Sequence, residues 1–249
     1  MPRVSLGAEQ EPALAPRSNR LPRGVRALYA GSLAAVSALI PVNNTNPLME
    51  LMVGEHVVTA AEERLSVIAS DVSRAQGGPR QVRVLCVDDE QVVTAFEHAK
   101  QSNVYGWVSH DVAPDNVYMR KSLCDGVNDV IDGRPLGGAM AVGVSTLSHE
   151  VRHLVDSDAG EAETECISQQ KVFEVATTAG ADPAKAQAIA DIALGFYHEL
   201  SPAYVTAECH AGGEYDLGSD GSGVFPFVYQ AGAYVPNETR SASAARMAP

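Results

Sequence analysis

The feature that most constrains the fold of this chain is a pair of histidines four residues apart, His149 and His153, inside a segment of helical periodicity. Residues four apart on an α-helix project from the same face, so both imidazoles can reach one metal ion. Apolar residues with 4-3-4-3 spacing form the opposite face: Met140, Val144, Leu147, Val151 and Leu154. We therefore predict a helix over about 138–156 that buries one side and directs its histidines toward a metal.

Glu150 follows the first histidine directly, which gives the motif the form His149-Glu150-x-x-His153. A carboxylate beside two metal-binding imidazoles can take a proton from a water molecule on the metal. Glu150 is therefore the predicted general base. The alternative is that the motif arose by coincidence of composition, which would leave a sensor domain without a metal.

A zinc site takes at least three protein ligands, and the segment after the motif offers Glu161, Glu163 and Glu165. On a helix, Glu161 and Glu165 lie on a common face and Glu163 points away from them. A solvated, acidic helix start is the alternative interpretation, because the helix dipole stabilises negative charge at that end.

These two segments resemble known metallopeptidases. His149-Glu150-x-x-His153 is the zincin signature, and Glu161-x-x-x-Glu165 resembles the pair of acids on the second helix of gluzincins. The resemblance implies a zincin-like core in which His149, His153 and Glu161 bind Zn²⁺ and Glu165 orients a histidine N–H. Only seven residues separate His153 from Glu161, fewer than in the large gluzincins.

A wider resemblance covers roughly residues 82–217. It rests on the order of a strand with a cysteine, the 117–124 segment, the His-Glu-x-x-His helix, its glutamate-rich successor and the 201–217 segment. This order is similar to that of uncharacterised actinobacterial exported proteins with a predicted zincin-type metallopeptidase core. The resemblance implies the fold and export, and no particular function.

The first 44 residues differ from the rest of the chain. Residues 1–26 carry five arginines against two glutamates, and an apolar run follows over 27–42. This order is typical of an export signal or a short signal anchor. The run is shorter than the roughly 20 residues of a membrane span, and a cleavage site after Ala38 is an alternative to an uncleaved anchor. A buried core helix is the remaining alternative.

We therefore expect three parts: a cytoplasmic basic segment plus signal peptide or anchor over 1–44, a zincin-like metallopeptidase domain over 45–235, and a disordered tail over 236–249. The predicted location is extracytoplasmic, either secreted or anchored to the cell membrane. The formal charge of −13 argues against a nucleic-acid partner, because few groups are available to neutralise phosphates.

The four cysteines fit export. An even count in an exported chain predicts two disulfides with three possible connectivities. We prefer Cys86–Cys124 and Cys166–Cys209, because each pair then lies on one side of the signature helix in the sequence. Buried free thiols are the alternative if the protein stays in the cytoplasm.

The predicted fold class is α+β, a helix-dominated zincin-like core with a small β-sheet. Helices are expected over 57–74, 91–100, 138–156, 161–178 and 183–200, and strands over 81–87, 105–109 and 116–120. If the last two strands pair, they form a small sheet beside the signature helix, and its edge strand can hold a peptide. The stretches 132–138 and 201–249 are expected to be loop.

The sequence thus predicts zinc-dependent peptide-bond hydrolysis outside the cytoplasm, with a peptide or protein as substrate. The alternative function is a non-catalytic, zinc-stabilised binding module of the cell envelope. A donor to the developing oxyanion is also expected, and His198, Tyr204 and His210 are the candidates. The segment 216–223 offers either a calcium loop or a plain turn.

Overall fold

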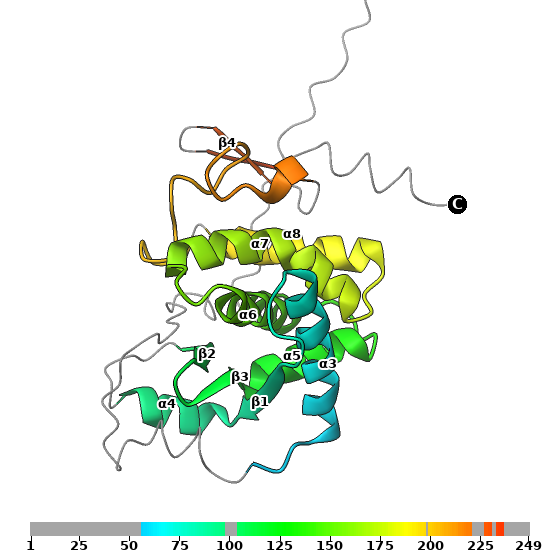
Figure 1. Cartoon of the computed structure of the whole chain (residues 1–249). Helices are drawn as coiled ribbons and strands as arrows, with labels where there is room; N and C mark the ends of the chain where they lie inside the picture. Colours follow the sequence, from blue (N-terminus) through cyan, green and yellow to red (C-terminus); the bar gives the residue numbers. More distant parts are fainter. Residues whose placement is uncertain (1–55, 98–103, 198, 221–226, 231–232, 237–249) are drawn as a thin grey trace, which may run out of the picture.

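The structure is a computed structural model, and it describes residues 56–97, 104–197, 199–220, 227–230 and 233–236 (Figure 1). The predictions for residues 1–44 and for the tail 236–249 lie outside the described residues, except that Pro236 is the last residue of a strand. The helices are α3 (Ala60–Ala75), α4 (Asp89–Glu97), α5 (Lys121–Ile131), α6 (Gly138–Val155), α7 (Glu161–Thr178) and α8 (Pro183–Tyr197), with a 3₁₀ turn η1 (Leu217–Asp220). The strands are β1 (Arg83–Val87), β2 (Gly106–Ser109), β3 (Ala113–Arg120), β4 (Phe227–Gln230) and β5 (Ala233–Pro236). This is an α+β fold dominated by helices, as predicted.

Helix α6 occupies the centre of the fold. It packs against α7 and α8 on one side and against α3, α5 and strands β2 and β3 on the other (Figure 1). Most of its residues are buried all around its circumference, including His149, Glu150 and His153. Burying polar side chains in this way is costly unless they find partners, so the surroundings of these histidines and of Glu150 bear directly on their role.

Helix α5 was not predicted, and it packs against α6 through two glycines. A β-carbon built on Gly126 would lie 2.3 Å from the carbonyl oxygen of Ala139, and one built on Gly143 would lie 2.4 Å from that of Leu123. The two backbones therefore touch where the helices cross. Leu123, Val127 and Val130 supply the apolar face of α5.

The three-stranded sheet has the order β1-β3-β2, with β1 parallel and β2 antiparallel to β3. One face packs into the main core, and α4 covers the other face. On the α4 side, the ring of Trp107 stacks on Tyr118 at 5.0 Å and meets Phe96 edge-on at 5.2 Å. These buried aromatic contacts fix β2 against β3.

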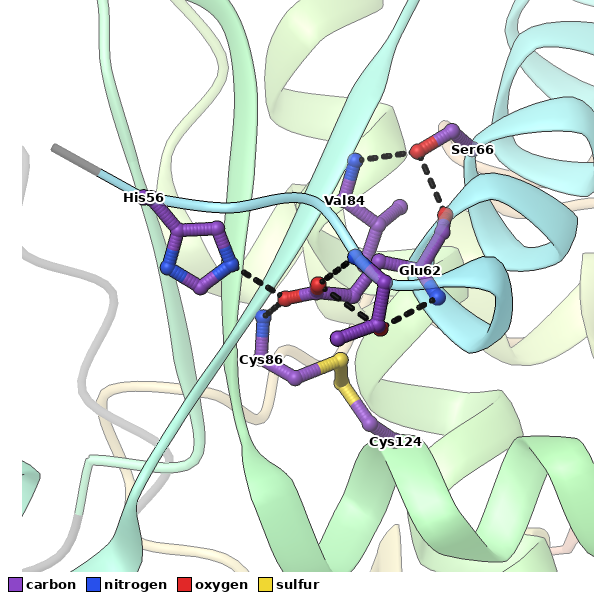
Figure 2. A network of polar contacts seen from close by, with 7 residues as sticks. His56, Glu62, Ser66, Val84, Cys86 and Cys124 are labelled. Atoms are coloured by element: carbon purple, nitrogen blue, oxygen red, sulfur yellow. Dashed lines mark hydrogen bonds and ion pairs between the residues drawn. A yellow bond between two sulfur atoms is a disulfide. The ribbon is translucent and has the colours of Figure 1, made fainter.

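Side chains of α3 occupy the outer edge of β1. The backbone N–H groups of Val82, Val84 and Cys86 donate to Ser70 Oγ at 2.9 Å, Ser66 Oγ at 2.9 Å and Glu62 Oε1 at 2.7 Å. Figure 2 shows the Ser66 and Glu62 contacts. The spacing of these side chains along α3 matches that of the N–H groups along the strand, because four helical residues advance about 6.0 Å and two strand residues about 6.6 Å. A helix thus replaces the next strand at this edge.

Two disulfides are present, and both preferred pairings are confirmed. Cys86–Cys124 joins β1 to α5, and Cys166–Cys209 joins α7 to the segment after α8. The tail contains a two-stranded antiparallel hairpin, β4–β5, where only loop was expected. Within the described part of the chain, no helix combines the length and apolar character that crossing a membrane requires.

Candidate metal centre

Three predicted ligands converge between α6 and α7. His149 and His153 lie one turn apart on α6, and residues 156–160 reverse the chain so that Glu161 is the first residue of α7. The Nε2 atoms of the two histidines are 3.1 Å apart. Glu161 Oε2 lies 3.2 Å from His149 Nε2 and 3.5 Å from His153 Nε2. The structure thus brings together the ligand set expected from the sequence.

The size of this triangle fits a small divalent ion. Ligand bonds of about 2.0–2.1 Å in tetrahedral geometry place ligand atoms about 3.3–3.4 Å apart. The measured separations of 3.1, 3.2 and 3.5 Å fall on both sides of that length. Two imidazoles and one carboxylate are also a donor set that zinc favours. His149, His153 and Glu161 therefore form a possible metal-binding group.

Glu165 supports the site from behind, as the gluzincin resemblance implies. Its Oε2 lies 2.7 Å from His149 Nδ1, and both side chains are buried. Since a carboxylate accepts hydrogen bonds, Nδ1 carries the hydrogen, and Nε2 is the nitrogen that would offer a lone pair to a bound metal. Gln169 Nε2 lies within hydrogen-bonding distance of Glu165 Oε1 at 2.7 Å and of Ser145 Oγ at 2.8 Å, which holds the carboxylate in place.

Glu163 points away from the site, as helical geometry predicts. Its carboxylate is partly exposed and lies 3.8 Å from the guanidinium of Arg152. Cys166, the next residue on that side of α7, is in the disulfide with Cys209. Glu161 and Glu165 are therefore the two acids of this segment that face the histidines.

The electrostatics of the group require a positive charge at its centre. The hydrogen bonds with Glu161 and Glu165 raise the pKa of His149 to about 10, although burial is the largest single effect and opposes them. Burial lowers the pKa of His153, and the charge on His149 adds to this. Burial works to raise the pKa of Glu161, but its contacts with the two histidines outweigh burial and lower it. A proton on His149 or a bound cation supplies the charge that the carboxylates demand.

Glu150 is buried beside this group without a hydrogen-bond partner for Oε2 among the described residues. Burial raises the pKa of its carboxyl to about 8, and the nearby Glu161 and Glu165 act in the same direction, whereas His149 opposes them. A carboxyl group whose pKa is raised toward neutral pH is suited to accept and return a proton.

The predicted oxyanion donors do not all lie at the site, in contrast to the predicted ligands. Tyr204, which follows α8, is buried with its ring centroid 6.1 Å from that of His149. His210 directs Nδ1 to the carbonyl oxygen of Ala211 at 3.0 Å, and its side chain is half-buried. His198 lies outside the described residues. Of the three, Tyr204 is the one placed beside a ligand.

The segment 216–223, for which a calcium loop or a plain turn was expected, is described as far as Asp220. Both carboxylate oxygens of Asp216 accept backbone hydrogen bonds, from Gly212 at 2.6 Å and from Gly218 at 2.7 Å. Asp216 therefore closes a turn. Residues 221–226 lie outside the described part of the chain.

Two further residues near the site were not predicted from the sequence. Gly106, on β2, lies directly against Glu150. His110, in the turn between β2 and β3, has a buried Nε2 with no hydrogen-bond partner among the described residues. His110 is also close enough for its charge to contribute to the lowered pKa of His153, after burial and His149. Neither residue belongs to a sequence motif, because their place depends on how β2 packs on α6.

Comparison of the chain with protein-family models, curated proteins and solved structures finds no match. The functional argument therefore rests on the residues and geometry described above.

Proposed function

We propose that this protein is a zinc-dependent peptidase that acts outside the cytoplasm. The observation that carries the proposal is the triangle of His149 Nε2, His153 Nε2 and Glu161 Oε2, with a second carboxylate, Glu165, behind His149. Zinc held there would supply a Lewis acid that lowers the pKa of a bound water to about 7 and polarises a carbonyl group.

Glu150 is the proposed general base. A site with a purely structural ion has no use for a free carboxylate at this position, whereas hydrolysis needs a group that takes a proton from the attacking water. The raised pKa of Glu150 suits the second half of that role, in which the carboxyl returns the proton to the leaving amine. Glu165 would hold the His149 ring in one orientation throughout.

The proposed substrate is a peptide in extended conformation. Strand β2 packs on α6 and pairs with β3 on one side, and no described strand pairs with its other side. The opposite edge of the sheet, at β1, is occupied by the side chains of α3. An extended peptide added to β2 would run beside the helix that carries His149 and Glu150.

A second candidate function is a non-catalytic, zinc-stabilised binding module of the cell envelope. The burial of the site favours it: His149, Glu150 and His153 are each 1% exposed or less, and of the ligands only the Glu161 side chain, at 23%, reaches solvent. An enclosed ion that ties α6 to α7 would stabilise the fold without turning over a substrate.

The location proposed for both functions is extracytoplasmic, since disulfides persist in oxidising compartments. The Cys86–Cys124 and Cys166–Cys209 pairs, with the charge pattern of residues 1–44, support this proposal. A fusion of residues 1–44 to a reporter active only outside the cytoplasm should give signal. A fusion without reporter activity, together with four alkylatable thiols in protein from the native host, would contradict it.

Metal analysis and a peptidase assay of the mature protein and of Glu150→Gln test the function. We expect one zinc per chain in both proteins, and a loss of roughly 10²- to 10⁴-fold in kcat for the variant. Stoichiometric zinc with no cleavage of a diverse peptide library would favour the binding module. Protein that purifies without zinc, and is unchanged by added zinc or chelator, would contradict both functions.

A further inference from the structure

Strand β2 passes close to Glu150 at Gly106. A β-carbon built on Gly106 would lie 2.8 Å from Glu150 Cγ, 2.9 Å from Glu150 Oε1 and 3.0 Å from Thr146 Cγ2. Distances below 3.0 Å between such atoms are not tolerated, so any larger residue would force something to move. The Glu150 side chain therefore occupies the space that a side chain on β2 would fill.

The backbone conformation does not explain why this position is a glycine. The described glycines with positive φ are Gly77, Gly133, Gly180 and Gly212, and Gly106 is not among them. Gly126 and Gly143 are also crowded, but the atoms nearest to them are backbone atoms at a helix crossing. Gly106 differs from these two because the atoms nearest to its built β-carbon are side-chain atoms, two of Glu150 and one of Thr146.

We propose that Gly106 is a positioning residue for Glu150. By lacking a side chain, it admits the Glu150 carboxyl group between β2 and α6 and sets its place beside His149. This inference rests on the proposed role of Glu150 as a base, but the contact itself can be tested without any activity.

The effect of a larger residue at position 106 depends on whether the strand or the Glu150 side chain can move. Strand β2 is held by the stacking of Trp107 on Tyr118 and by its pairing with β3, where Gly106 lies opposite Met119. The Glu150 carboxyl is the free end of a flexible side chain with no partner for Oε2 among the described residues. An alanine at position 106 would therefore displace the carboxyl group and leave the strand in place.

The metal ligands should be spared by that displacement. None of the three atoms nearest to the built β-carbon of Gly106 belongs to His149, His153 or Glu161. Glu165 and Gln169 hold His149 from α7. Gly106→Ala should thus impair the proposed base and leave the metal ligands intact, whereas a general loss of structure would impair both.

A double-mutant cycle in thermal unfolding tests the contact. We expect Gly106→Ala to lower the Tm of the zinc-loaded wild type and to lower it clearly less when Glu150→Ala has removed the crowding atoms. Gly137→Ala is the matched control, because a β-carbon there meets nothing within 4 Å, and its effect should be the same in both backgrounds. Equal losses of Tm from Gly106→Ala in the two backgrounds would overturn the inference.

The role of the contact is tested by zinc content and kinetics. Gly106→Ala should keep one zinc per chain and lose roughly 10- to 100-fold in kcat with little change in KM, because a displacement of about 1 Å has effects of this size. Glu150→Asp, which shortens the acid, should cost less activity in the Gly106→Ala background than in the wild type. Wild-type kcat in Gly106→Ala would overturn the positioning role. Inactive wild-type protein with a non-additive Tm cycle would leave the contact established and refute the peptidase proposal and, with it, the positioning role.

Discussion

Glu165 on α7 lies 2.7 Å from His149 on α6, measured between Oε2 and Nδ1. Glu161, one turn earlier on α7, reaches the other nitrogen of the same ring at 3.2 Å. One imidazole is thus held at both nitrogens by two acids of a single helix face. A shift of α7 along its axis would change both contacts together, so the position of this helix controls the geometry of the site.

The first prediction separates the three glutamates of α7. Glu161→Ala should lose most of the zinc affinity, because it removes a ligand. Glu165→Ala should lose about 10- to 100-fold, since it removes the support of His149, and Glu165→Gln should lose less because its amide oxygen can still accept from Nδ1. Glu163→Ala is the control and should change little, since Glu163 faces Arg152. A competitive zinc titration measures the order, and greatest damage from Glu163→Ala would contradict the assignment.

The second prediction concerns the histidines. His149→Ala and His153→Ala should each abolish stoichiometric zinc and remove the rise in Tm that zinc gives the wild type. A ligand that binds the folded state alone adds about 4 kcal/mol at a thousandfold excess over its Kd. Calorimetry with and without added zinc measures the difference. Half-buried His210, which contacts Ala211, supplies the control His210→Ala, and loss of zinc there as well would indicate unspecific damage.

The candidate metal site was predictable in part from helical periodicity, and the roles of Glu161 and Glu165 in it came from the gluzincin resemblance. A spacing of four puts His149 beside His153 and Glu161 beside Glu165, and it turns Glu163 away. The structure confirms each of these placements. What the sequence left open was whether the two helices face each other, and that depends on the five-residue turn 156–160 and the buried core.

Helix α5 was missed because its stability comes from packing. The segment contains Gly126, Asn128 and Asp129, which have low helix propensity. Contact of its backbone with α6 outweighs that preference. The β4–β5 hairpin was missed for another reason: the glycine and serine content of the tail concealed two short runs with β-forming residues, 227–230 and 233–236.

The contact between Gly106 and Glu150 could not be predicted from the sequence. It joins residues far apart in the chain, and it depends on which face of β2 meets α6. A glycine in a short predicted strand has many possible reasons, including a bulge or a close approach of any neighbour. The placement of His110 near His153 has the same origin.

The third prediction tests the α5–α6 crossing. Gly143→Ala should destabilise the protein by about 1–3 kcal/mol, because a β-carbon would lie 2.4 Å from the Leu123 carbonyl oxygen and backbone cannot easily yield. Gly137→Ala, at the start of the same helix, has open space and should cost much less. Urea unfolding of both variants measures the difference. Equal stability of the two would contradict the close crossing.

The fourth prediction concerns stability in acid. Burial acts to raise the pKa of Glu62, but hydrogen bonds from Cys86, Thr59 and His56 outweigh it and hold the pKa below the ordinary value of 4.5 (Figure 2). A carboxyl with a lowered folded-state pKa gives its full stabilisation above the unfolded-state pKa, and loses it as the pH falls through the folded-state value. Stability should therefore decline below about pH 4.5.

Denaturant unfolding between about pH 6 and pH 3 checks this decline. Glu62→Gln should be less stable than the wild type at the upper end, and its loss toward acid should be smaller. Glu63→Gln, the exposed neighbour on the same helix, should follow the wild-type curve. Parallel curves for Glu62→Gln and the wild type would show that Glu62 does not contribute to the acid response.

The hydrogen bonds that Ser70, Ser66 and Glu62 of α3 accept along β1 also decide how this protein can associate with itself. A sheet with two open edges can add chains on both sides and so propagate into a fibre. Here α3 closes one edge, and among the three strands of this sheet only β2 keeps a side that no described strand or helix occupies. Strand pairing between two copies through this sheet would therefore stop at a dimer, and such a dimer would cover the strand that passes Glu150.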